Sequence, residues 1–154
     1  CNYGDVSSWN ISHARNVGAM FEGCGSFNGN VSSWNVANAG DLNSVFHGCG
    51  SFNGDVSSWN VANANNLSFL FYGCMSFNGD VSSWNVSNAT NMISMFQGCF
   101  VFNRDVSSWN VANATHGGVS AMFDDCHSFN RHHVATWNLS IYDILSMFDV
   151  PFDE

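Results

Sequence analysis

Apolar positions return along this chain at a fixed interval of 25 residues. Each return carries the string Val-Ser-Ser-Trp-Asn, followed after a polar stretch by a pair of Phe residues. The copies of the string open at Val6, Val31, Val56, Val81 and Val106, with a divergent copy at Val134. A period of roughly 20 to 50 residues is typical of proteins built by stacking one repeat on the next.

Within one copy, residues 31–54, two periodicities follow each other. Apolar and polar residues alternate over 34–36, which predicts a β-strand. Apolar residues three and four apart over 42–46 predict one or two turns of α- or 3-10 helix. Gly48 ends this helix, and Asn53-Gly54 forms a tight turn into the next copy.

When the copies are aligned, the same aromatic residue recurs at three positions. These Trp and Phe columns are Trp9, Trp34, Trp59, Trp84, Trp109 and Trp137; Phe21, Phe46, Phe71, Phe96, Phe123 and Phe148; and Phe27, Phe52, Phe77, Phe102 and Phe129. We expect them to form one continuous core. The strands of successive coils would then pair in parallel on one face, with the short helices on the other.

The predicted fold is therefore an α/β repeat solenoid of about six coils, forming one domain over residues 1–154. Its coils start near residues 6, 31, 56, 81, 106 and 134. The last coil lacks the recurring Cys and carries Pro151, so we expect it to be a C-terminal cap. An N-terminal cap is expected to be missing, because a consensus strand follows directly after Gly4.

The net charge of the chain excludes some classes of binding partner. The chain has no Lys, three Arg and twelve acidic residues, for a net charge of -9. Such a chain offers no basic surface to a nucleic acid or an anionic membrane. Although 45% of the residues are hydrophobic, no run approaches the ~20 apolar residues of a membrane-spanning helix. We therefore expect a protein or glycan partner, and no cofactor.

The candidate binding surface is the outward side of the predicted strands, where small uncharged residues recur. Its residues, the Ser/Asn columns, are Ser8, Asn10, Ser33, Asn35, Ser58, Asn60, Ser83, Asn85, Ser108, Asn110, Thr136 and Asn138. Such ladders could bind a protein or a glycan, or order water as ice-binding proteins do. The alternative is a solvated sheet whose ladders stabilise the stack.

A second column is acidic, with Asn30 in its gap. It consists of Asp5, Asp55, Asp80 and Asp105. Stacked carboxylates could bind Ca²⁺, but no second acidic ligand recurs in the repeat. We expect these residues to start turns and to bind no metal.

The remaining reactive residues predict no catalysis. Five Cys share a column, Cys24, Cys49, Cys74, Cys99 and Cys126. We expect them to be buried free thiols, with vertical disulfides as the alternative. His127, His132 and His133 lie near Cys126 in a spacing that fits no standard zinc site, so we expect a surface loop there. We also expect a surface loop at the two-residue insertion near Thr115. No nucleophile, base and orienting group come together, so an enzyme is not expected.

The consensus of the copies resembles a known family. The pattern Val-Ser-Ser-Trp-Asn-Val-(Ala/Ser)-Asn-Ala, continued by Phe-x-Gly-Cys-x-Ser-Phe-Asn-Gly-Asp, is similar to the bacterial surface-protein repeat of about 26 residues. That repeat is grouped with BspA-like leucine-rich-repeat surface proteins and also occurs in mycoplasmas and algae. The resemblance implies a leucine-rich-repeat-like solenoid, an extracellular or cell-surface location, and a role in binding or adhesion without catalytic residues.

Together these observations predict a non-enzymatic surface or secreted repeat domain for protein or glycan recognition. A structural or linker subunit of a larger assembly, joined through the open N-terminal end, is the alternative. Ice binding is the third hypothesis.

Overall fold

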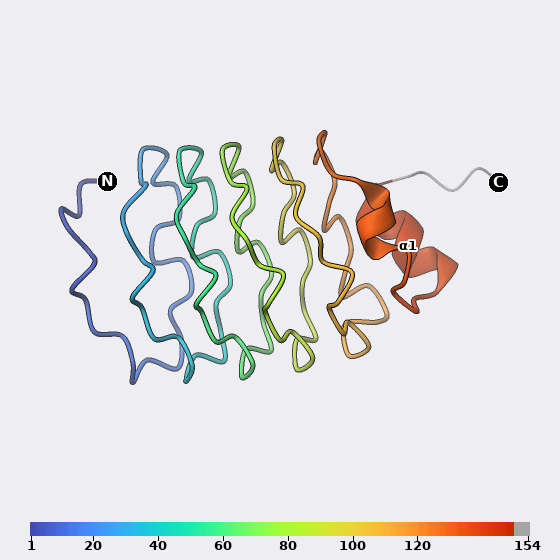
Figure 1. The fold of residues 1–154 in the computed structure, drawn as a ribbon, viewed down its shortest axis with the longest axis horizontal. Coiled ribbons are helices and arrows are strands. Elements are labelled where there is room, and N and C mark those ends of the chain that lie inside the picture. Colours follow the sequence, from blue (N-terminus) through green and yellow to red (C-terminus); the bar gives the residue numbers. More distant parts are fainter. Residues whose placement is uncertain (150–154) are drawn as a thin grey trace.

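The computed structural model describes residues 1–149. Successive copies of the repeat lie side by side along the longest axis of the molecule, from the first copy near the N-terminus to helix α1 (Figure 1). The 3-10 helix η1 spans Arg131–Val134, and the α-helix α1 spans Ile141–Met147. The rest of residues 1–149 forms turns, bends and irregular backbone. Neither helix is long and apolar enough to cross a membrane.

The expected α/β solenoid of the leucine-rich-repeat type is wrong. Residues 1–149 contain no β-strand, so they form no parallel β-sheet. Both helices lie after residue 130 and do not recur from copy to copy. Strand-like pairing is limited to three isolated parallel bridges, Asn16–Asp41, Asp41–Asn66 and Asn66–Asn91.

Polar side chains prevent the expected strand. The Asn35 side-chain oxygen accepts a hydrogen bond from the Ala37 N–H at 3.0 Å, and Asp55 does the same for the Ser57 N–H at 2.9 Å. Each of these contacts closes a turn over two residues, so the chain turns on both sides of the expected strand and the strand cannot be extended. Consistent with this, the Val-Ser-Ser-Trp string is itself a turn, in which the Trp34 N–H donates to the Val31 carbonyl at 3.1 Å.

Backbone conformation prevents the expected helix. Ser44, in the middle of the predicted helix over 42–46, has a φ of +56°, which a right-handed helix does not accommodate. The equivalent positions in other copies also have positive φ; they are Ala19, Phe69, Ser94 and Ala121. As a result, the N–H groups of Leu42, Ser44 and Phe46 leave their own copy. They donate at 3.0 Å to the carbonyls of the next copy, those of Asn66, Ser68 and Leu70.

The core consists of the predicted aromatic columns, stacked ring on ring. The Trp59 and Trp84 ring centroids lie 6.3 Å apart with nearly parallel planes, and the two Phe columns contact each other at 3.9 Å between Phe46 and Phe52. Both of these Phe side chains are fully buried. The prediction that the Trp and Phe columns build the core is confirmed for all copies between the two ends.

Each buried Trp also connects its copy to the one before it. The Trp59 Nε1 donates to the Val31 carbonyl at 3.0 Å, and Trp34, Trp84, Trp109 and Trp137 make the same bond at 3.0–3.1 Å. A buried indole N–H needs such a partner. The Trp column therefore combines apolar packing with a fixed register between copies.

The last described segment lies against the copy before it. The Ala121 and Phe123 N–H groups donate to the Ser146 and Met147 carbonyls at the end of α1, at 2.7 and 2.9 Å. Ser140 caps the start of α1 by accepting from the Asp143 N–H. The predicted cap residue Pro151 lies outside the described residues.

We expect replacement of Trp59 by Phe to lower the free energy of unfolding by about 2 kcal/mol. The variant loses the bond to the Val31 carbonyl and leaves a small cavity. Urea denaturation followed by circular dichroism measures the change.

The matched control is Trp9→Phe. Trp9 is 37% exposed, and its indole N–H makes no hydrogen bond within residues 1–149. We expect this variant to lose less than about 1 kcal/mol. Equal losses at the two positions would contradict a structural role for the indole bond.

Candidate binding surface

All twelve residues of the Ser/Asn columns are exposed at the surface. From the second copy on, the hydroxyl of the column donates to a main-chain carbonyl of the preceding copy. Ser58 donates to Ser32 at 2.7 Å and Ser108 donates to Ser82 at 3.1 Å. The hydroxyl groups are thus held in place by the stacking of the copies.

The first five Asn residues of the same columns are held within their own copy. The Asn60 and Asn110 side-chain oxygens accept from the Ala62 and Ala112 N–H groups at 3.1 Å. Their Nδ2 groups make no hydrogen bond within residues 1–149, so they are available as donors to a ligand. The columns therefore present fixed amide donors at regular intervals along the stack.

The Asp column closes turns in the same way. The Asp55 Oδ1 accepts from both the N–H and the hydroxyl of Ser57, and Asp80 makes the same pair of bonds with Ser82. These bonds, the hydroxyl bond most of all, lower the pKa of all four column Asp residues. Residues 1–149 hold no group of three His, Cys, Asp or Glu side chains arranged to bind a metal ion.

The Cys column divides into one disulfide and four thiols. Cys24 is bonded to Cys1, which the sequence did not predict, since Cys1 lies outside the column. The thiols of Cys49, Cys74, Cys99 and Cys126 are free, as expected. Each contacts a Phe carbonyl of the preceding copy at 2.9–3.1 Å; the carbonyls belong to Phe21, Phe46, Phe71 and Phe96.

The irregular loops near Thr115 and His127 form local contacts. The Thr115 hydroxyl lies 2.8 Å from the His116 Nδ1, and His127 stacks on Phe100 with 5.1 Å between ring centroids. The loop expected at His132 and His133 is wrong, because both residues lie in η1. His132 is exposed, while the His133 Nδ1 lies 3.6 Å from an Asp105 carboxylate oxygen. The His residues are dispersed among separate partners.

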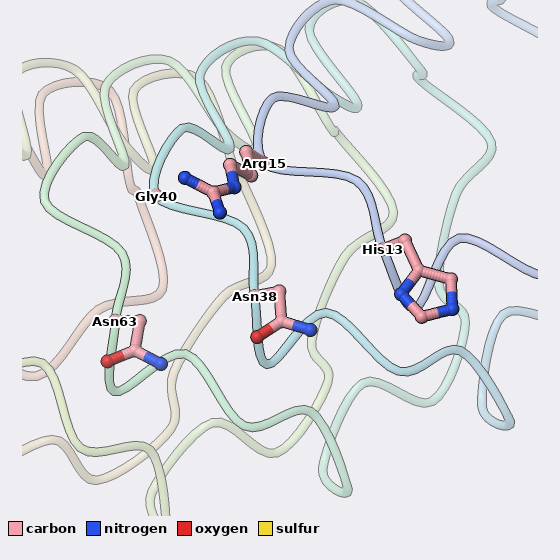
Figure 2. Close-up of a pocket in the computed structure, with 5 residues that line it drawn as sticks. All are labelled: His13, Arg15, Asn38, Gly40 and Asn63. Carbon is pink, nitrogen blue, oxygen red and sulfur yellow. The ribbon is translucent and has the colours of Figure 1, made fainter.

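The structure also contains an open groove that sequence reasoning missed. His13, Arg15, Asn38, Gly40 and Asn63 line a cavity of about 390 Å³ across the first three copies. In Figure 2, Arg15 extends beside the loop that carries Gly40, and Asn38 and Asn63 occupy equivalent points on successive loops. One feature of the sequence could have indicated this groove. Arg15 occupies a position at which the following copies have Gly40, Asn65 and Thr90.

Stacked copies with buried aromatic columns and exposed polar columns define this chain as a repeat protein. Residues 1–99 and 63–151 match the family described as Mycoplasma protein of unknown function, DUF285. The two matches together span nearly the whole chain, so the chain belongs to this family. No curated protein and no solved structure matches the chain.

We expect the free thiols to be almost unreactive in the folded protein. Burial raises the pKa of Cys49 to about 11 and that of Cys126 to about 12, and it also raises the pKa of Cys74 and Cys99. The thiolate is the reactive form, so little of it is present at pH 8. Ellman's reagent measures how many thiols react before and after the protein is unfolded with urea. Rapid reaction of several thiols without urea would contradict this arrangement.

We expect acid to weaken the fold in part through the Asp column. A carboxylate with a lowered folded-state pKa stabilises the fold above its unfolded pKa of about 3.9, and this stabilisation is lost as pH falls through the folded value. The double variant Asp55→Asn and Asp80→Asn keeps the turns, as Asn30 does with Ser32. Its urea midpoint should fall less between pH 5 and pH 3 than that of the unaltered protein. An equal fall would count against the contribution of these carboxylates.

Proposed function

We propose that this chain is a non-enzymatic recognition domain that binds a protein or a glycan through its Ser/Asn columns. The observation that carries the proposal is the exposure of all twelve column residues, at equivalent positions of successive copies. Because hydrogen bonds hold both the hydroxyl and the amide groups, a ligand would order few side chains on binding.

The amide donors of the Ser/Asn columns recur once per copy, and this spacing favours an extended partner. A chain whose polar groups repeat along its length meets the same amide group once per copy, so weak contacts add up along the stack. The absence of aromatic residues from these columns favours a polar ligand over an apolar one.

The contacts around His116 support a function without catalysis. Asp143 is the buried carboxylate of this region, and its oxygens accept from the Gly117 N–H at 3.1 Å and the Ser140 hydroxyl at 2.8 Å. These bonds fix the start of α1. The Asp143 carboxylate therefore has a structural role, in which it connects α1 to the turn at Gly117.

The disulfide supports a secreted or surface location for this domain. Disulfides form and persist mainly outside the reducing cytosol, and Cys1 and Cys24 are joined by one. The resemblance of the repeat to BspA-like surface proteins points the same way, and the adhesion role that it implies is part of this proposal.

Binding to arrays of immobilised glycans and extracellular proteins tests the proposal. The double variant Ser58→Arg and Ser83→Arg places two bulky charges in the Ser/Asn columns, and we expect it to bind about tenfold more weakly or worse. The double variant Ser51→Arg and Ser76→Arg is the matched control, since it places the same charges one copy apart at other exposed positions. Equal loss in both variants, or no binding by the unaltered chain, would refute the proposal.

A second candidate function is that of a structural subunit in a larger assembly. The observation that favours it is a group of exposed apolar side chains, Met75, Phe100 and Val101, of which the first two occupy equivalent positions in neighbouring copies. Gel filtration with light scattering separates the candidates. A stable monomer that binds array ligands favours recognition, whereas association or precipitation of the isolated chain favours assembly.

A further inference from the structure

We infer, on the basis of the recognition function proposed above, that the groove around Arg15 binds the carboxylate of an acidic saccharide. The groove is lined by His13, Arg15, Asn38, Gly40 and Asn63 (Figure 2). Its volume of about 390 Å³ falls within the range of small-ligand sites. His13, Asn38 and Asn63 each follow a residue of the Ser/Asn columns by three positions, but none of the groove residues belongs to those columns.

Arg15 differs from the other two arginines in having no partner for its side chain. The Arg104 Nε donates to the Asn78 carbonyl at 2.8 Å, and Arg131 lies 4.3 Å from the centre of the Phe148 ring. The Arg15 guanidinium is exposed and makes no hydrogen bond or ion pair within residues 1–149. In a chain of net charge -9 without Lys, this is an unpaired cation whose planar fork matches a carboxylate.

The neighbouring Asn residues present acceptors, and their orientation is fixed. The Asn38 Nδ2 donates to the Ser12 carbonyl at 2.7 Å, and the Asn63 Nδ2 donates to the Ala37 carbonyl at 2.8 Å. Only the NH₂ end of an amide can face a carbonyl, so each Oδ1 is left as the outward group. Neither Oδ1 accepts a hydrogen bond within residues 1–149.

This combination selects the ligand class. A guanidinium requires an anionic group, while two amide oxygens require donors such as hydroxyls. Sulfate supplies only acceptors and the hydrogen phosphate dianion carries a single O–H donor, so neither ion can pair Arg15 and both Asn oxygens at once. A uronic acid carries a carboxylate and several hydroxyls on one ring, and it satisfies both kinds of group.

Gly40 keeps the groove open beside Arg15. A Cβ at this position would meet only the Asn63 and Arg15 carbonyl oxygens, at 3.9 and 4.0 Å, so a side chain there fits without disturbing the fold. The equivalent positions of later copies carry Asn65 and Thr90. Replacing Gly40 by Thr therefore fills the groove with a residue that the repeat already accepts.

Heteronuclear NMR titration with methyl β-D-glucuronide tests the inference, with methyl β-D-glucoside as the ligand that lacks only the carboxylate. We expect the glucuronide to shift the Arg15 Nε–H and the Asn38 and Asn63 amide signals, with a Kd on the order of 1 mM for so small a ligand. Arg15→Gln and Gly40→Thr should each weaken binding about tenfold or more. Arg104→Gln removes the same charge elsewhere and should leave the Kd unchanged.

Equal shifts with the glucoside, or unchanged binding by Arg15→Gln, would overturn the inference. The same full pattern with inorganic sulfate would also overturn it, because it would show an anion site without saccharide selection. Glucuronide shifts confined to the Ser/Asn columns, around Asn35 and Asn60, would refute this groove while leaving the proposed recognition function intact.

Discussion

A buried main-chain N–H or carbonyl group must be paired, and in this chain the pairing runs between copies of the repeat. The segment over 42–46 shows the constraint most clearly. Its alternate N–H groups point out of the copy and donate to the carbonyls of residues 66, 68 and 70. A single copy could not satisfy these groups by itself. Each copy thus depends on its neighbour for its main-chain hydrogen bonds, as a strand does in a sheet, whereas a helix forms these bonds internally.

The recurring side chains also pair main-chain groups between copies, but they donate to carbonyls of the preceding copy and not of the next one. Trp59 and Cys74 each donate to a carbonyl of the preceding copy, and Asn63 does so at the surface. The aromatic columns exclude water from the Trp59 and Cys74 contacts, and within the core a hydrogen bond is strengthened by its surroundings. This explains why Trp, Cys and Asn recur at fixed positions where other apolar or polar residues could fill the same space.

The sequence predicts the burial of its columns well and their backbone conformation poorly. Burial follows from residue type and interval, so Trp59, Phe46 and Cys74 are buried as expected. The conformation of a short segment depends on local competition, which a hydrophobic pattern does not register. Asn35 closes a turn with the Ala37 N–H at the end of the expected strand, and Ser44 adopts a left-handed conformation in the expected helix. Turn chemistry of Asn and Asp was visible in the sequence, and it outweighed the alternation of apolar residues.

The candidate sites show a similar division. The exposure of the Ser/Asn columns follows from the repeat, because each of their residues falls between core positions. The groove at Arg15 depends instead on the few positions where one copy departs from the others. Its residues come from three copies, 25 residues apart, and their proximity follows only from the stacking of those copies.

The hydrogen bonds between copies also have a direction. On one side of a copy the main-chain N–H groups of Leu42, Ser44 and Phe46 project outward; on the other side the matching row consists of carbonyls. Two such molecules related by a two-fold axis would bring donors against donors or carbonyls against carbonyls. At the copy that precedes α1 this row is already occupied, because the Ala121 and Phe123 N–H groups donate to the Ser146 and Met147 carbonyls at the end of α1. The α1 segment therefore blocks head-to-tail association through these N–H groups, which is the heterologous contact that would build a line of molecules.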